Sequence, residues 1–182
     1  MQTRSGACPA AFFVSAAFAG GTRRAKPQAM STPDERLAAL GLTLPEPRAP
    51  VANYVPFVRQ GDAFYISGQV STDAAGGVRG VVGEDVSADE AKRAARICGL
   101  NLIAQMKAAL DGDLARVARV VKLNGFVQAG PGFFDIPQVV NGCSDLMVEV
   151  FGDAGRHARS AVGVYRLPLN FAVEVDAVVE VR

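Results

Sequence analysis

The C-terminal stretch of the chain decides the fold, and residues 157–178 read HARSAVGVYRLPLNFAVEVDAV. Two valine-rich runs flank a Leu-Pro-Leu-Asn segment, which predicts two β-strands joined by a turn. If the turn is tight, Glu174 pairs near Gly163 and Arg159 pairs near Val178. We therefore expect these two charged side chains to lie about four residues, or roughly 13 Å, apart.

Alternation along these strands separates two faces. In the last strand, residues 171, 173, 175, 177, 179 and 181 are apolar, whereas the positions between them are mixed. In the preceding strand Arg159, Ala161, Gly163 and Tyr165 share a face whose small side chains would let another subunit approach. A face that is half charged and half small and apolar predicts a homo-oligomer.

The upstream sequence supplies the other layers. A Ser87-Ala88-Asp89-Glu90 capping box begins a helix with an apolar stripe up to Leu110. The remaining predicted elements are a short helix at 33–41, strands at 54–58 and 63–67, a strand at 117–128 and a second long helix capped by Asp135. The order β-β-α-β-α-β-β predicts an α+β fold with two helices packed on one face of a mixed sheet.

Composition limits the classes of function. The chain has 182 residues and a net charge of +1, which argues against a strongly electrostatic nucleic-acid binder. Three cysteines and a single histidine, with no close-spaced cysteine pair, suggest neither a disulfide framework nor a zinc site. We therefore expect no metal, no nucleic-acid partner and a reducing, cytoplasmic location.

Residues 1–32 differ from the rest, because their basic side chains meet no acidic residue before Asp34. We expect a leader or miscalled N-terminus, followed by one domain at 33–182. Three alternatives remain: translation starting at Met30, a secretory signal with Ala11–Ala19 as its apolar run, or an organelle transit segment. A genuine signal in residues 1–29 would mean export. The apolar run is too short to span a membrane, and we expect no membrane partner.

Six segments of the sequence resemble the RidA/YjgF family of reactive-intermediate deaminases, formerly called L-PSP endoribonucleases. They are Tyr54-Val55-Pro56, Ile66-Ser67-Gly68-Gln69, Asn141, Ala158-Arg159-Ser160, Leu167-Pro168 and Val173-Glu174-Val175. The resemblance covers roughly residues 33–182 and implies a chorismate-mutase-like fold, a homotrimer and a ligand pocket between subunits. It implies hydrolysis of 2-imino and 2-enamino acids to 2-keto acids and ammonia, without a metal or organic cofactor.

The resemblance also assigns roles to residues. Arg159 matches the arginine that holds the substrate carboxylate, and Glu174 matches the glutamate that orients or activates water. Tyr54, Gly68 and Asn141 match positions in the substrate pocket. Because the predicted hairpin separates Arg159 from Glu174, we expect a neighbouring subunit to complete the pocket.

Some positions depart from the family pattern. His157 stands where the family usually has proline, and its role is either that of an acid or base near Arg159 or that of a loop residue. The alternative function is a non-catalytic trimeric module that binds a small carboxylate metabolite through Arg159, and it would not need Glu174. Ribonuclease activity is a third candidate, which the absence of a basic and aromatic surface disfavours.

Overall fold

The computed structural model describes residues 31–47 and 52–182. The predicted leader lies outside these residues, except for Ser31 and Thr32, and Thr32 caps the first helix. The helices and strands are α1 (Pro33–Ala39), β1 (Phe57–Gln60), β2 (Ala63–Val70), α2 (Ala88–Ala109), β3 (Val117–Gln128), α3 (Ile136–Phe151), β4 (Ala158–Val164) and β5 (Val173–Val181). After α1, this is the predicted order.

The five strands form one mixed sheet in the order β1-β2-β5-β3-β4. β4 runs parallel to β3, and the other neighbouring pairs are antiparallel. The predicted hairpin is therefore wrong, because β3 lies between β4 and β5. The α3 helix connects β3 to β4 in a β-α-β unit, which is the usual way to join parallel neighbours.

A buried glutamine at the end of β3 explains how the chain crosses from β4 to β5. The Oε1 of Gln128 accepts a hydrogen bond from the backbone N–H of Leu167 at 2.8 Å, and its Nε2 donates to Asn170 Oδ1 at 2.6 Å. Leu169 and Asn170 both have positive φ angles, 54° and 61°, which reverse the chain locally. Gln128 thus holds the connection across the end of β3, where sequence reasoning placed a simple hairpin turn.

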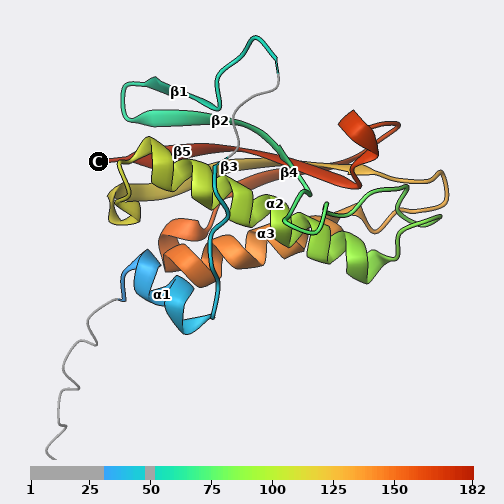
Figure 1. Ribbon diagram of the computed structural model, residues 1–182, viewed down its shortest axis with the longest axis horizontal. Coiled ribbons are helices and arrows are strands. Elements are labelled where there is room, and N and C mark those ends of the chain that lie inside the picture. Colours follow the sequence, from blue (N-terminus) through green and yellow to red (C-terminus); the bar gives the residue numbers. More distant parts are fainter. Residues whose placement is uncertain (1–30, 48–51) are drawn as a thin grey trace, which may run out of the picture. The chain divides into compact units, whose positions relative to one another are not determined.

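Two long helices cover one face of the sheet (Figure 1), as predicted. α2 begins at the predicted capping box, in which Ser87 Oγ accepts from the Glu90 N–H and the Glu90 carboxylate accepts from the Ser87 N–H. α3 begins after Asp135, but the Asp135 side chain makes no capping hydrogen bond. The helices cross closely at Gly142, where a Cβ atom would lie 2.0 Å from the Lys92 carbonyl oxygen.

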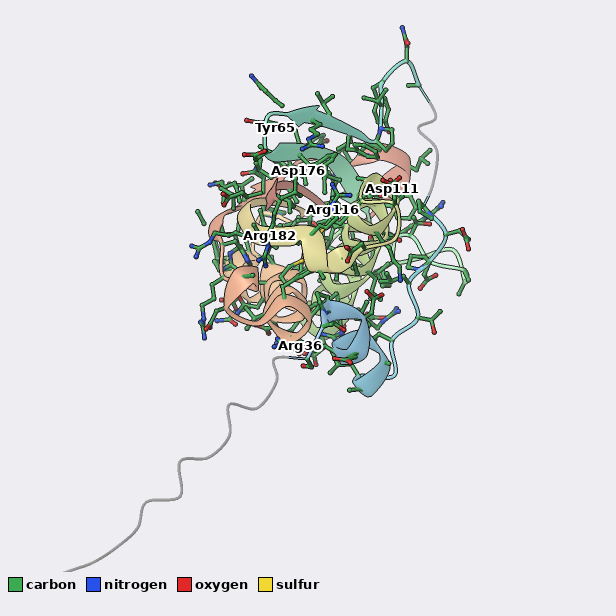
Figure 2. The ribbon with its side chains drawn as sticks, turned by 90° about the vertical axis from the view of Figure 1, so that its left-hand side faces the viewer. Arg36, Tyr65, Asp111, Arg116, Asp176 and Arg182 are labelled. Carbon is green, nitrogen blue, oxygen red and sulfur yellow. The ribbon has the colours of Figure 1, made fainter. Side chains whose placement is uncertain are left out.

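The core lies between this helical layer and the sheet. Alternate residues of β5 contribute to it and are buried, which confirms the predicted apolar face: Val173, Val175, Ala177, Val179 and Val181. The residues between them point to the opposite side of the sheet, which we call the open face. Asp176 and Tyr65, both labelled in Figure 2, belong to the open face, and Tyr65 pairs with Val178.

The prediction that Arg159, Ala161, Gly163 and Tyr165 form one uncovered face of β4 was wrong. Arg159, Ala161 and Gly163 pair with Leu123, Gly125 and Val127 of β3, which are buried on the helical side. Arg159 and Ala161 therefore face α3 instead of forming an uncovered surface. Tyr165 lies beyond the end of β4 and is 82% exposed. On β4 the open face is instead formed by Ser160 and Val162.

No helix within residues 31–47 and 52–182 is both long and apolar enough to cross a membrane.

Replacing Gln128 with alanine tests its role in the crossing. The change would leave the partly buried N–H of Leu167 and the buried carbonyl of Gly80 without their partner, so we expect the free energy of unfolding to fall by about 2–4 kcal/mol. Urea denaturation monitored by circular dichroism measures the loss. Gln60→Ala, at an exposed position on β1, serves as the control and should change stability by less than about 0.5 kcal/mol. Equal stability of the two variants would contradict the role of Gln128.

Candidate functional site

Arg159 is held on the helical side of the sheet by two polar residues of α3. Its Nη1 donates to Asn141 Oδ1 at 2.7 Å and to Ser144 Oγ at 3.1 Å. Asn141 and Ser144 are three residues apart on the helix, so both present their side chains to the same face. The structure therefore brings together Arg159 and Asn141, two of the predicted site residues.

The opposite edge of the guanidinium remains available to a ligand. Both hydrogen bonds start from Nη1, and no residue within 31–47 and 52–182 accepts from Nε or Nη2. No carboxylate in this part of the chain forms an ion pair with Arg159, whereas Arg96 pairs with Glu149 at 2.8 Å. The Nε–Nη2 fork of a guanidinium matches the two oxygens of a carboxylate.

Sequence reasoning missed Ser144, which links Arg159 to His157. Ser144 Oγ lies 3.0 Å from His157 Nε2, and His157 Nδ1 lies 2.7 Å from the Gly155 carbonyl oxygen. Burial lowers the pKa of His157, and the positive charge of Arg159 lowers it further, although the hydrogen bond to Gly155 opposes these effects. The spacing of Ser144 from Asn141, one helical turn, is the sequence signal that could have identified it.

Glu174 lies on β5 and points to the open face, next to Gly68. A Cβ atom at position 68 would lie 2.0 Å from Glu174 Oε1, so any residue larger than glycine would displace this carboxylate from its position. Gly68 lies in an irregular part of β2, where the register with β5 shifts between Ile66 and Gln69. Sequence reasoning ended the strand there, but β2 continues to Val70. The bulge brings Gly68 against Glu174.

Tyr54 precedes β1 on the segment held beside this bulge. Ser67 Oγ donates to the Val55 carbonyl at 2.8 Å, and the Ser67 N–H donates to the Pro56 carbonyl at 2.9 Å. The Tyr54 residue is 52% exposed, so much of it can be contacted by a ligand or another protein chain. Tyr54, Gly68 and Glu174 thus belong to one region, built around β2 and β5.

The Glu174 carboxylate is in an environment that disfavours its charge. Partial burial raises its pKa, and the negative charge of Asp176, two residues along the open face, raises it further. Asp176 accepts a hydrogen bond from Asn124 Nδ2 at 2.7 Å. Glu174 has no such donor among the described residues. The contrast leaves Glu174 as the carboxylate that can accept a hydrogen bond from a bound water.

The two groups of predicted site residues do not meet within one chain. Through β3, Arg159 is level with Ala177 on β5, while Glu174 is level with Val162 on β4. Arg159 and Glu174 are therefore two strands apart across the sheet and three residues apart along it, each about 10 Å. They also point to opposite faces. The predicted hairpin pairing of the two strands was wrong, but Arg159 and Glu174 are separated, as the prediction required.

The two cysteines among the described residues, Cys98 and Cys143, are buried and free. Burial raises the pKa of Cys143 to about 12, and the pKa of Cys98 is also raised well above its usual range by burial. Both thiols therefore stay protonated and unreactive at neutral pH. Within residues 31–47 and 52–182, no cluster of three or more His, Cys, Asp or Glu side chains could hold a metal ion.

Comparison with known proteins identifies relatives along most of the chain. The family described as "YjgF/chorismate_mutase-like, putative endoribonuclease" matches residues 34–181. Protein TCP17 of Trypanosoma cruzi is 50% identical over 148 residues, covering 80% of this chain and 92% of that protein. The 2-iminobutanoate/2-iminopropanoate deaminase of Dermatophagoides farinae is 32% identical over 136 residues, covering 73% of this chain and 89% of that enzyme.

A solved structure agrees with these relationships. The crystal structure of a protein of unknown function from Agrobacterium tumefaciens has a TM-score of 0.78 and 48% sequence identity, covering 82% of this chain and 92% of that one. The match of the family to residues 34–181, together with the mixed sheet and its helical layer, settles the classification. The chain belongs to the RidA/YjgF family and has its chorismate-mutase-like fold.

Proposed function

We propose that this protein hydrolyses 2-imino and 2-enamino acids to 2-keto acids and ammonia. The observation that carries the proposal is the guanidinium of Arg159, which is anchored through Nη1 and keeps its Nε–Nη2 fork without a protein partner in the described residues. A fork presented in this way fits a small carboxylate. The similarity to the deaminase from Dermatophagoides farinae supports the proposal that this carboxylate belongs to an imino acid.

The reaction requires little of the protein beyond orientation. Water adds to the carbon of the C=N bond, giving a carbinolamine, and proton transfer to nitrogen lets the C–N bond break with release of ammonia. The oxygen of the water remains as the keto oxygen. Because the imine carbon is already electrophilic, holding the substrate carboxylate and aiming the water supply most of the rate enhancement.

Glu174 is the proposed residue that aims the water. Its carboxylate accepts no hydrogen bond from the described residues, and its pKa is raised, so it is a stronger base than an ordinary glutamate. Gly68 leaves the space in which the carboxylate lies. Tyr54 and Asn141 are proposed as substrate-binding residues, with Asn141 acting through its hydrogen bond to Arg159.

The separation of the two charged groups supports a pocket shared between subunits of a homotrimer. Arg159 and Glu174 lie on opposite faces of one sheet, so one substrate contacts both only if each comes from a different copy. The open face also carries apolar side chains, including Val162, which is 45% exposed, and Tyr65, which is 49% exposed. Contact between copies would remove this apolar surface from water.

A non-catalytic carboxylate-binding module is the second candidate. The observation in its favour is that the Arg159 group is complete within one chain, whereas Glu174 is not near it. An endoribonuclease, the activity in the family description, fits less well. Neighbouring carboxylates, Glu174 and Asp176, occupy the open face and would repel a phosphate backbone.

Substitution of the two charged residues separates the candidates. We expect Arg159→Ala to lower kcat/KM for freshly generated 2-aminoacrylate at least 100-fold, about 2.7 kcal/mol, because the substrate carboxylate loses its anchor. Glu174→Gln should lower kcat by roughly 10²- to 10⁴-fold, because the water loses its base. The release of pyruvate and ammonia measures both.

Arg156→Ala is the matched control, because Arg156 is exposed and, among the described residues, forms an ion pair only with Asp153, at 3.4 Å. Its kinetic constants should equal those of the wild type. Equal background rates for all four proteins would reject the deaminase. Retained binding of pyruvate by Glu174→Gln, together with a wild type that catalyses no hydrolysis, would favour the non-catalytic module.

The pH dependence tests the assignment of the base. Glu174 must be deprotonated to activate water, and its pKa is raised, so kcat/KM should fall on acidification at a pH above the usual range for glutamate. Replacing Asp176 with asparagine removes a negative charge that contributes to this shift. In Asp176→Asn the acidic fall in kcat/KM should therefore move to lower pH. A profile that is unchanged in this variant would contradict the role of Glu174.

Mixing two inactive variants tests the shared pocket. In trimers formed from equal amounts of Arg159→Ala and Glu174→Gln subunits, about a quarter of the pockets would combine an intact arginine with an intact glutamate from the neighbour. We therefore expect unfolding and refolding the two variants together to restore about a quarter of wild-type activity. Each variant refolded alone is the control. No restoration in verified mixed trimers would place both residues in pockets formed by the same copy.

A further inference from the structure

The hydrogen bonds around Ser144 give every donor an acceptor in one arrangement of protons. The Gly155 carbonyl can only accept, so His157 Nδ1 must carry a proton. Arg159 can only donate, so Ser144 Oγ accepts from its Nη1. The single proton of the Ser144 hydroxyl can then point to His157 Nε2, which accepts it when the imidazole is neutral. All four groups are satisfied only when the imidazole is neutral and in its Nδ1–H form.

In this arrangement Arg159 donates to Ser144, Ser144 donates to His157, and His157 donates to the Gly155 carbonyl. This arrangement fixes the edge of the guanidinium that faces α3, and so it determines where the opposite Nε–Nη2 fork points. An arginine side chain otherwise loses much rotational freedom when it binds a ligand. Holding Nη1 in advance lowers that loss for every carboxylate that binds.

We propose that Ser144 and His157 are positioning residues that aim Arg159 at the substrate carboxylate, and that protonation of His157 disables this alignment. The inference rests on the proposed role of Arg159. Once protonated, His157 has an Nε2–H group that would donate to Ser144 Oγ, the atom that already accepts from Arg159. The Ser144 hydroxyl proton would then lose its acceptor, and two cations would donate to the same oxygen. Repulsion between these like charges would weaken the anchor between Ser144 and the guanidinium.

Apart from the Gly155 carbonyl, the described surroundings of His157 offer no group that would stabilise its charged form. Arg159 on β4 acts on it with a like charge. In the turn before it, Asp153 pairs with Arg156, and on α3 Asp145 pairs with Lys92 at 3.7 Å. On β3, Lys122 lies in register with Ala158 and donates to Ser160 Oγ. No carboxylate among the described residues pairs with the imidazole, which therefore stays neutral at neutral pH.

The chain contains a single histidine, so its protonation and tautomer can be observed directly. In the untagged full-length protein, the two imidazole ¹⁵N chemical shifts should report the Nδ1–H form at pH 8. The apparent pKa of His157 should lie below that of a free histidine, and Ser144→Ala should change the Nε2 shift. An Nε2–H tautomer in the wild type would overturn the proposal.

Binding of 2-oxobutanoate, a 2-keto acid that cannot react further here, tests the effect on Arg159. By isothermal titration calorimetry, Ser144→Ala and His157→Ala should raise Kd roughly three- to tenfold at pH 8. Their kcat at saturating substrate should stay close to that of the wild type, because neither residue touches the reacting atoms. Unchanged Kd values in these variants, with folding verified by circular dichroism, would overturn the proposal.

His157→Gln is the matched variant for the pH effect. Glutamine places a carbonyl oxygen near the position of Nε2, so it can accept from Ser144 but cannot be protonated. Lowering the pH from 8 to 5.5 should weaken wild-type binding severalfold more than it weakens binding to His157→Gln. Equal weakening of both proteins would assign the pH effect to another group and overturn the proposed disabling by protonation.

Measuring both 2-oxobutanoate binding and imine hydrolysis distinguishes the positioning role of Ser144 and His157 from the proposed deaminase activity. If the wild type binds 2-oxobutanoate in a Ser144-dependent manner but hydrolyses no imine, the deaminase is rejected and the positioning role stands. If it hydrolyses imines and Ser144→Ala leaves KM unchanged, the deaminase stands and the positioning role is rejected. A wild type that binds no 2-oxobutanoate would reject the positioning role as well.

Discussion

The arrangement of the sheet depends on the buried side chain of Gln128, which carries the chain across the end of β3. Gln128 binds both Leu167 and Asn170 on the segment that connects β4 to β5, and β5 enters the sheet on the far side of β3 from β4. β5 then becomes a central strand with one buried face. β4 stays at the edge of the sheet, where Arg159 can reach the polar side chains of α3. The positions of both charged groups follow from this crossing.

Local chemistry predicted the elements well but did not predict which of them are neighbours. The capping box at Ser87 and the limits of β3 agree with the structure because they depend on residues close in sequence. The predicted pairing of β4 with β5 was wrong because the alternation of side chains indicates which face of a strand is buried but does not indicate which strand lies next to it. The signal that would have corrected it, a buried Gln128 bonded across 39 residues, is visible only in three dimensions.

The candidate site was predictable only as far as residue types and family resemblance reach. Arg159 and Asn141 do lie together, and so do Gly68 and Glu174. Resemblance could not supply Ser144, because its importance arises from a hydrogen bond to Arg159 and another to His157. Nor could it show that Arg159 and Glu174 face opposite sides of one sheet, since that depends on the register through β3.

Each group of site residues contains a charge that the described residues leave incompletely satisfied. Arg159 has two fixed hydrogen bonds but no carboxylate partner in the described residues, while Glu174 lies beside a second carboxylate and receives no hydrogen bond there. Such groups reduce the stability of a lone subunit, because partly buried charges need partners. A bound substrate would satisfy Arg159 through its carboxylate, and a water beside the substrate would satisfy Glu174. The same chemistry that disfavours the isolated chain therefore favours an assembled and occupied pocket.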